Sequence, residues 1–307
     1  MPTMTGSRFF AEAMRGNRVS HVFLVPTIIL PALAEMEDLD IRRVTTHGEK
    51  AAPYMADGYA RAARRPGVCM AQNVGAANLA ARLRDAFLAC SPVIAITGGP
   101  DPETRYGHIY QEVEDFPMFD PVTKLNLQVD DVKRLPDLLR LTFRTATSGA
   151  PGPVHLRLRG RHGGVVEDEA DLGLVVEEQF TCYPAFRPEP DLDRVGEAAR
   201  PLQPARRPAI VAGGGVTASG AAPQVVELAE RLVIPVATSL NGKGTIADDH
   251  PLSVGVVGTY SRWCANRVVA ECVLSASAVR SARRCPPTRC WWLTPATRAS
   301  GPRRWSI

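Results

Sequence analysis

The sequence predicts an α/β protein, with a parallel-sheet, helix-flanked N-terminal domain, then a partial second α/β domain and an irregular tail. Over about the first 160 of the 307 residues, short apolar runs alternate with amphipathic stretches. Such alternation with short connections is typical of a parallel sheet that carries helices on both faces. The pattern is interrupted after Gly160, resumes near residue 191 and ends near Glu271.

Five apolar runs in the first region are interpreted as strands, and the longer amphipathic stretches as the helices that connect them. Residues that interrupt regular structure mark the ends of several of these runs, since Pro26 follows the first run and Gly98 follows the fourth. The predicted strands are residues 21–25, 41–46, 68–71, 92–97 and 154–158. The predicted helices are residues 28–36, 50–63, 76–89 and 132–147, with a loop-rich stretch before the last of them.

The interruption and the second run of the pattern predict the domain organisation. Residues 1–160 form the first domain, and the charged, proline-containing residues 161–190 are interpreted as a linker. Residues 191–270 are interpreted as a partial second domain. Within that region an amphipathic stretch at 222–232 lies between predicted strands at 208–212 and 234–238.

The last segment, 271–307, differs in composition from the rest of the chain. It holds three of the seven Cys, three of the four Trp and seven Arg, without a helical or strand period. A sequence of this composition after an ordered α/β pattern is what translation of GC-rich DNA in a shifted reading frame would produce. A natural disordered basic tail and a nucleic-acid-binding extension are the alternatives.

Composition narrows the classes of function. The formal net charge of +4 belongs to the tail, because the chain before Glu271 holds 29 of the 36 basic and 31 of the 32 acidic residues. The body therefore gives no electrostatic case for nucleic acid. No run approaches the roughly 20 apolar residues of a membrane span, and the N-terminus lacks a signal-peptide pattern. We therefore expect no membrane association and a cytoplasmic location. The Cys spacing predicts no metal site.

Several motifs, in order along residues 5–158, resemble the pyrimidine-binding domain of the thiamine-diphosphate-dependent enzymes of the acetolactate synthase/pyruvate decarboxylase type. The most specific is residues 47–61, which resembles the family signature His-Glu-x-x-Ala-x-x-Met-Ala-Asp-Gly-Tyr-Ala-Arg. Further matches are residues 21–26, 75–78, 95–98, 110–112, 121–124 and 152–156. Residues 208–215, 241–244 and 249–255 resemble the central domain of the family.

The resemblance implies the reaction class and one central residue. It implies a carboligase or decarboxylase of 2-keto acids, acetolactate synthase-like, in which Glu49 is the carboxyl group that shares a proton with N1′ of the cofactor's aminopyrimidine. Burial raises the pKa of a carboxyl group and makes such sharing feasible near neutral pH. Glu49 also follows the second predicted strand, where ligand sites of open α/β sheets collect.

By the same resemblance, Pro26, Gly75, Asn78 and Gln111 line the cofactor site with Glu49. Asn78 is interpreted first as the cap of the helix that begins at Ala76, with a site contact as the alternative. Two departures from the family lie nearby. Thr27 stands where the family has glycine, and Gly48 separates His47 from Glu49, so His47 is not expected to be catalytic.

The family holds the cofactor's diphosphate through Mg²⁺ with a Gly-Asp-Gly…Asn motif, and no Gly-Asp-Gly occurs in this sequence. The Mg²⁺ ligands are therefore expected outside this chain. Assembly is expected as a homo-oligomer or by pairing with a full-length relative. Gly213-Gly214-Gly215 is interpreted as a tight turn, with FAD binding at this position as the alternative. Other functions considered are an oxalyl-CoA decarboxylase or sulfoacetaldehyde acetyltransferase type of enzyme, or a non-catalytic fragment.

Overall fold

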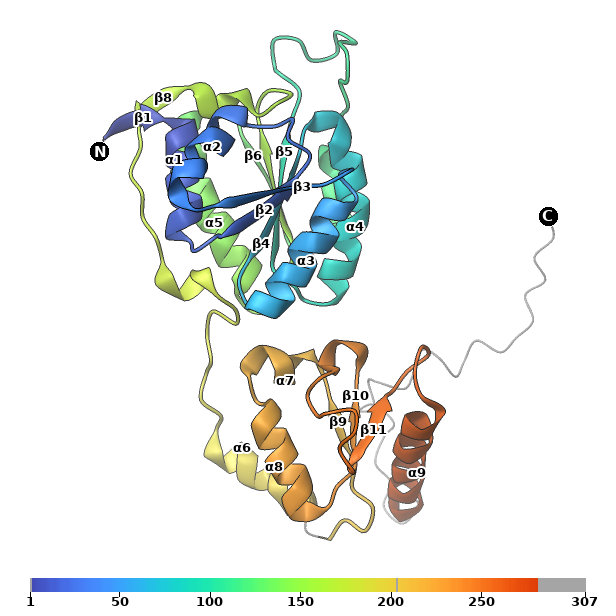
Figure 1. The fold of residues 1–307 in the computed structure, drawn as a ribbon. Helices are drawn as coiled ribbons and strands as arrows, with labels where there is room; N and C mark the ends of the chain where they lie inside the picture. Colours follow the sequence, from blue (N-terminus) through green and yellow to red (C-terminus); the bar gives the residue numbers. More distant parts are fainter. Residues whose placement is uncertain (1, 203, 281–307) are drawn as a thin grey trace, which may run out of the picture. The chain divides into compact units, whose positions relative to one another are not determined.

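The computed structural model describes residues 2–202 and 204–280, which fall into two compact units that divide between Pro188 and Glu189. Each unit has its own parallel sheet flanked by helices (Figure 1). No helix in these described ranges is long and apolar enough to cross a membrane. The predicted α/β class is confirmed.

The first unit is built on a six-stranded sheet with the order β3-β2-β4-β5-β7-β6, and every neighbouring pair in it is parallel. Its strands are β2 (His21–Leu24), β3 (Arg42–Thr45), β4 (Gly67–Ala71), β5 (Val93–Gly98), β6 (Leu125–Val129) and β7 (Val154–Leu158). Its helices are α1 (Gly6–Gly16), α2 (Leu30–Glu35), α3 (Ala51–Ala63), α4 (Ala76–Leu88) and α5 (Leu135–Thr147).

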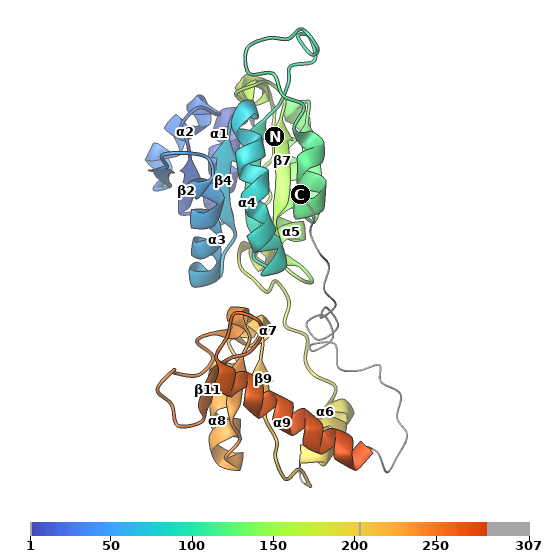
Figure 2. The ribbon, with the colours of Figure 1, turned by 90° about the vertical axis from the view of Figure 1, so that its right-hand side faces the viewer.

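Helices cover both faces of this sheet because the central strands are apolar on both sides. Val68 and Met70 of β4 belong to the cluster that includes α1, α2 and α5, whereas Cys69 and Ala71 belong to the cluster under α3 and α4. Figures 1 and 2 show these two helical layers on opposite sides of the strands. Burial of both faces is the usual condition of an all-parallel sheet.

The predicted linker at 161–190 is corrected by the structure, because most of it packs on the first unit. Residues Glu169–Asp171 form β8, which pairs antiparallel with β1 (Thr3–Thr5). Val166, Leu172 and Phe180 of the same stretch are buried in the first core. These apolar residues are separated by charged ones at irregular intervals, so the segment contributes to the core without showing a strand or helix period.

The second unit has a three-stranded parallel sheet with the order β11-β10-β9 and a small core. Its elements are α6 (Leu192–Ala199), β9 (Ile210–Ala212), α7 (Gly214–Ser219), α8 (Ala222–Leu232), β10 (Val236–Thr238), β11 (Ser253–Val256) and α9 (Trp263–Arg280). Helix α9 runs through the predicted start of the tail at residue 271, so a helix continues where no period was expected. The remainder of the predicted tail, 281–307, lies outside the described residues.

Candidate functional site

The carboxyl ends of β2 and β4 mark the place in the first sheet where a ligand crevice is expected. From β2 the chain continues to β3 on one side, and from β4 it continues to β5 on the other. In open parallel sheets, ligands bind outside the carboxyl ends of strands at such a reversal of direction. The residues after β2, β3, β4 and β5 are therefore the candidates for the site.

Glu49 lies in the turn that joins β3 to α3, and local hydrogen bonds fix this turn. The Thr46 hydroxyl donates to the Gly48 carbonyl at 3.0 Å, and the Ala51 amide donates to the same carbonyl at 3.1 Å. The Glu49 side chain is half-buried, so the described residues provide only part of the burial that favours proton sharing by this carboxyl group. The neighbouring His47 is exposed.

Two of the predicted cofactor residues contact the Glu49 carboxylate directly. The Asn78 side-chain amide donates to Glu49 Oε2 at 3.3 Å. Gly75 lies so close that a Cβ atom there would be 2.7 Å from Glu49 Cγ and 2.9 Å from Oε1. Glycine at position 75 thus leaves the space that the Glu49 side chain occupies. Glu49, Gly75 and Asn78, which are far apart in sequence, form one cluster.

Asn78 does not cap α4, so that first interpretation was wrong. The residue before the helix is Gly75, and no side chain caps its backbone amides. Asn78 is the third residue of α4, and its amide reaches Glu49 instead of its own helix end. The alternative interpretation, a residue of the site, fits this geometry.

Pro26 and Thr27 form the turn after β2 at the same edge of the sheet. Pro26 is exposed, and the Thr27 amide donates to the Val25 carbonyl at 2.8 Å. Thr27 is not among the residues with positive φ. The turn here therefore does not need the conformational freedom of glycine, which explains how threonine is accommodated.

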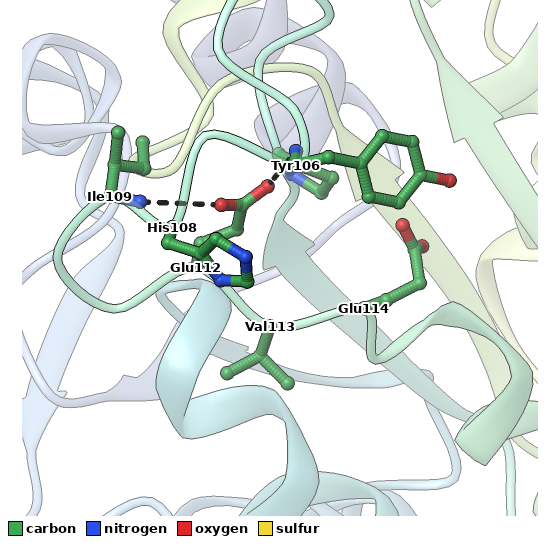
Figure 3. Close-up of a pocket in the computed structure, with 7 residues that line it drawn as sticks. Tyr106, His108, Ile109, Glu112, Val113 and Glu114 are labelled. Atoms are coloured by element: carbon green, nitrogen blue, oxygen red, sulfur yellow. Dashed lines mark hydrogen bonds between the residues drawn. The ribbon is translucent and has the colours of Figure 1, made fainter.

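Gln111 lies in the long loop after β5, which extends beyond the carboxyl edge of the sheet (Figure 1). Residues of this loop line a pocket of about 310 Å³, and the Glu112 carboxylate accepts from the Tyr106 amide at 2.5 Å and the Ile109 amide at 3.3 Å (Figure 3). Gln111 is half-buried. No hydrogen bond among the described residues joins Gln111 to Glu49, so the structure does not bring Gln111 into the Glu49 cluster.

A short segment crosses this edge of the sheet, and all of it except its first residue had been predicted as part of the linker. Residues 160–163, the crossing segment, leave β7 and pass over the ends of β5, β4 and β2 in turn. The Gly99 amide donates to the Gly160 carbonyl at 3.1 Å, and the Asn73 amide donates to the Arg161 carbonyl at 3.2 Å. At the end of β2, His162 Nδ1 lies 2.8 Å from the Thr27 carbonyl.

Glycines allow the crossing segment to lie close to the strands. A Cβ at Gly98 would stand 2.0 Å from the Arg161 carbonyl oxygen, and Gly160 and Gly163 have positive φ values of 89° and 76°. A run of Gly-Arg-His-Gly-Gly directly after a buried strand was the signal in the sequence that could have drawn attention to this segment.

Beside the crossing segment, a buried polar network holds the end of the β5 loop. Arg157 of β7 donates from Nη1 to Glu114 Oε1 at 2.8 Å and to Asp115 Oδ1 at 3.4 Å. With its amide nitrogen turned toward them, Asn73 also reaches Asp115 Oδ1 at 3.2 Å and the Val113 carbonyl at 3.1 Å. Asp115 Oδ2 is buried and has no hydrogen-bond partner in residues 2–202 and 204–280. Burial raises the pKa of Asp115 to about 6, although Arg157 opposes the shift.

A second buried polar group lies on the same face of the sheet. His155 of β7 has Nε2 2.8 Å from the Thr97 hydroxyl and Nδ1 2.6 Å from Asn126 Oδ1, and its ring stacks on Phe119. Burial lowers the pKa of His155 well below 6.5. This histidine is therefore neutral and has a structural role in the core of the first unit.

The described residues offer little for the other predicted ligands. Within residues 2–202 and 204–280, no group of three or more His, Cys, Asp or Glu side chains could hold a metal ion. At the predicted FAD position, Gly214 packs on Asn241, where a Cβ would lie 3.1 Å from the Asn241 Cβ. Gly213 and Gly215 have nothing within 4 Å of such an atom. FAD stays a prediction.

Fold and site together define a parallel α/β domain with a carboxylate, Glu49, at the carboxyl edge of its sheet. Residues 4–118 match the family described as thiamine pyrophosphate enzyme, N-terminal TPP binding domain, and residues 195–274 match its central domain. A solved structure of a candidate thiamin diphosphate-dependent enzyme from Mycobacterium smegmatis covers 83% of this chain at a TM-score of 0.68 and 24% identity, with 48% of its own length matched. That likeness supports the fold.

Sequence relatives carry the more specific finding. A probable acetolactate synthase large subunit of Methanocaldococcus jannaschii is 35% identical over 286 residues, which cover 92% of this chain and 48% of the relative. The acetolactate synthase isozyme 1 large subunit of Escherichia coli is 32% identical over 87% of this chain and 47% of its own length. This chain belongs to the thiamine-diphosphate-dependent enzymes of the acetolactate synthase type. It spans about half the length of these relatives.

Proposed function

We propose that this chain supplies the pyrimidine-binding half of a thiamine diphosphate site in a carboligase or decarboxylase of 2-keto acids. The observation that carries the proposal is the cluster of Glu49, Gly75 and Asn78 at the carboxyl edge of the sheet. It joins one half-buried carboxylate, one side-chain amide that holds it, and one position where only glycine leaves room. Thiamine diphosphate, when bound, supplies a nucleophilic carbon at C2 of its thiazolium ring.

The residues of this chain have separate tasks in the proposed site. Glu49 shares a proton with N1′ of the aminopyrimidine, which requires a carboxyl group within hydrogen-bond reach of that nitrogen. Asn78 orients the Glu49 carboxylate through its 3.3 Å hydrogen bond. Pro26 and Thr27 form the turn at the end of β2, beside the same edge. Gln111 is proposed to lie toward the substrate, on the support of the family resemblance alone.

The proposal places the remaining parts of the site outside the described residues. The cofactor's diphosphate is proposed to bind through Mg²⁺ whose ligands come from a full-length relative that pairs with this chain. We also propose a cytoplasmic location, on the sequence prediction. The chain by itself should bind thiamine diphosphate no more tightly than roughly the millimolar range, where a complex is worth about 4 kcal/mol.

The test of the proposal is the rate of C2–H/D exchange of thiamine diphosphate bound to a complemented enzyme. Residues 1–272 are joined to the C-terminal portion of a full-length relative, and Glu49→Gln is compared with the unchanged chimera. Gln is nearly isosteric and can accept the Asn78 hydrogen bond, but it cannot deliver a proton. Since a positioned general acid or base contributes about 10²- to 10⁴-fold, exchange should slow by about that factor.

The matched control is His47→Ala, a change two residues away at an exposed side chain. It should alter the exchange rate far less. Equal exchange rates in Glu49→Gln and the unchanged chimera would show that Glu49 only stabilises the turn before α3, and the proposed role would then be wrong.

A further inference from the structure

Arg161 differs from the two other arginines of its stretch because its guanidinium has no carboxylate partner among the residues that the structure describes. Arg157 pairs with Glu114 and Asp115, and Arg159 pairs with Asp168 at 2.6 Å. Arg161 takes part in none of the ion pairs of the described residues. Within the described part of the chain, its side chain makes one hydrogen bond, from Nη1 to the Tyr110 carbonyl at 2.9 Å.

The opposite edge of this guanidinium carries a donor that has no acceptor. Nε of Arg161 is shut off from solvent and makes no hydrogen bond to any described residue. An unpaired buried donor is costly, so such groups mark places that an acceptor normally fills. The Nε and Nη2 hydrogens of arginine form a planar fork that matches the two oxygens of a carboxylate.

The position of Arg161 in the fold links it to the proposed site. Its carbonyl accepts from the Asn73 amide at 3.2 Å, and Asn73 begins the short turn that ends at Gly75. Gly75 in turn lies against the Glu49 side chain. One three-residue turn therefore separates the backbone of Arg161 from the Glu49 cluster, at the crevice between β2 and β4.

We propose that Arg161 binds the carboxylate of the 2-keto acid substrate through its Nε/Nη2 edge. The inference rests on the proposed function and adds the residue that recognises the charged end of the substrate. Because Nε is screened in the present conformation, the carboxylate reaches it when the exposed loop at Tyr110 moves. That loop is joined to the Arg161 side chain by the single hydrogen bond to the Tyr110 carbonyl.

The experiment titrates the 307-residue chain with pyruvate and follows binding by ligand-observed NMR, without cofactor. Arg161→Gln is compared with Arg159→Gln, a change two residues away in a guanidinium that already has the Asp168 partner. Pyruvate should bind the unchanged chain with a millimolar dissociation constant. Since a hydrogen bond to a charged group is among the stronger ones, Arg161→Gln should raise that constant by about tenfold or more. Arg159→Gln should leave it unchanged.

Two further ligands separate the carboxylate from other sources of affinity. Methyl pyruvate lacks the charge, so its binding should be the same in the unchanged chain and in Arg161→Gln. Inorganic pyrophosphate stands in for the phosphate end of the cofactor. If pyrophosphate binds in an Arg161-dependent way and pyruvate does not, Arg161 recognises phosphate and the inference is wrong.

Equal pyruvate binding in the unchanged chain and in Arg161→Gln, or no binding of pyruvate well above millimolar concentration, would also overturn the inference. Far-UV circular dichroism confirms that both variants are folded, and Arg161→Lys, which keeps the charge without the planar fork, should fall between the unchanged chain and Arg161→Gln. None of these titrations depends on the Glu49 exchange measurement. Failure here is therefore distinguishable from failure of the proposed function.

Discussion

Replacing Asp115 with asparagine should remove a pH-dependent loss of stability from the first unit. Asp115 is fully buried, and burial raises its pKa from the usual 3.8 to about 6. Between these two values the unfolded chain releases the Asp115 proton while the folded chain keeps it. The free energy of unfolding therefore falls as the pH rises from about 4 to about 6, and the loss is complete above the folded pKa.

The size of this effect follows from the difference between the two pKa values. One pKa unit corresponds to about 1.36 kcal/mol, so the difference of about two units corresponds to about 3 kcal/mol. The amide introduced by Asp115→Asn does not titrate, and its oxygen can still accept from Arg157. The wild-type chain should therefore lose about 3 kcal/mol relative to Asp115→Asn between pH 4 and pH 7.

The assay is urea unfolding of both proteins at a series of pH values, read by far-UV circular dichroism. Tryptophan fluorescence would not report on the first unit, since all four Trp residues lie at position 263 or beyond. Taking the difference between the two proteins removes the titration of all other groups. A difference that stays constant from pH 4 to pH 7 would refute the reasoning, because it would mean that Asp115 has the same pKa in both states.

The remaining predictions concern two glycines and one histidine of the first unit. Gly67→Ala should destabilise by about 3 kcal/mol in urea unfolding, because a Cβ there would lie 2.1 Å from the Ala56 carbonyl oxygen in the core. Gly58→Ala is the matched control within α3, with nothing within 4 Å of the added atom, and it should stabilise by about 0.5–1 kcal/mol. His155→Gln should remove an acid-side loss of stability. Burial lowers the pKa of the neutral ring well below 6.5, so below about pH 6.5 the unfolded chain binds a proton that the folded chain does not. The free energy of unfolding therefore falls by up to about 1.4 kcal/mol per pH unit as the pH falls below that value. An identical acid-side slope of unfolding free energy in His155→Gln and the wild type would contradict the last prediction.

The central strands could be predicted because each is a continuous apolar run, as in Val93–Gly98 of β5. β6 was missed for a physical reason. It is an edge strand, and its apolar residues alternate with Asn126 and Gln128, which serve the buried polar network. Helix α1 was also missed, although Thr5 caps it by accepting from the Arg8 amide.

Part of the candidate site could likewise be predicted from the sequence, and part of it could not. Glu49, Gly75 and Asn78 could be identified because they lie in local motifs with a fixed spacing. The crossing segment could not be placed, because its position depends on hydrogen bonds to residues more than 60 positions away, at Gly99, Asn73 and Ile29. Neither spacing nor hydrophobic period records such contacts.

The pairing of β1 with β8 has a consequence for how the first unit is made. Thr3 lies opposite Asp171, and Thr5 lies opposite Glu169, so the residues of β1 are synthesised about 165 residues before their strand partners. β1 therefore waits without its strand partner until β8 has left the ribosome. The sheet strands β2 to β5 can assemble during that interval, since they are consecutive along the chain. Pairing of β1 with β8 should be among the last steps in the folding of the first unit, and it is completed only after residue 171 has been translated.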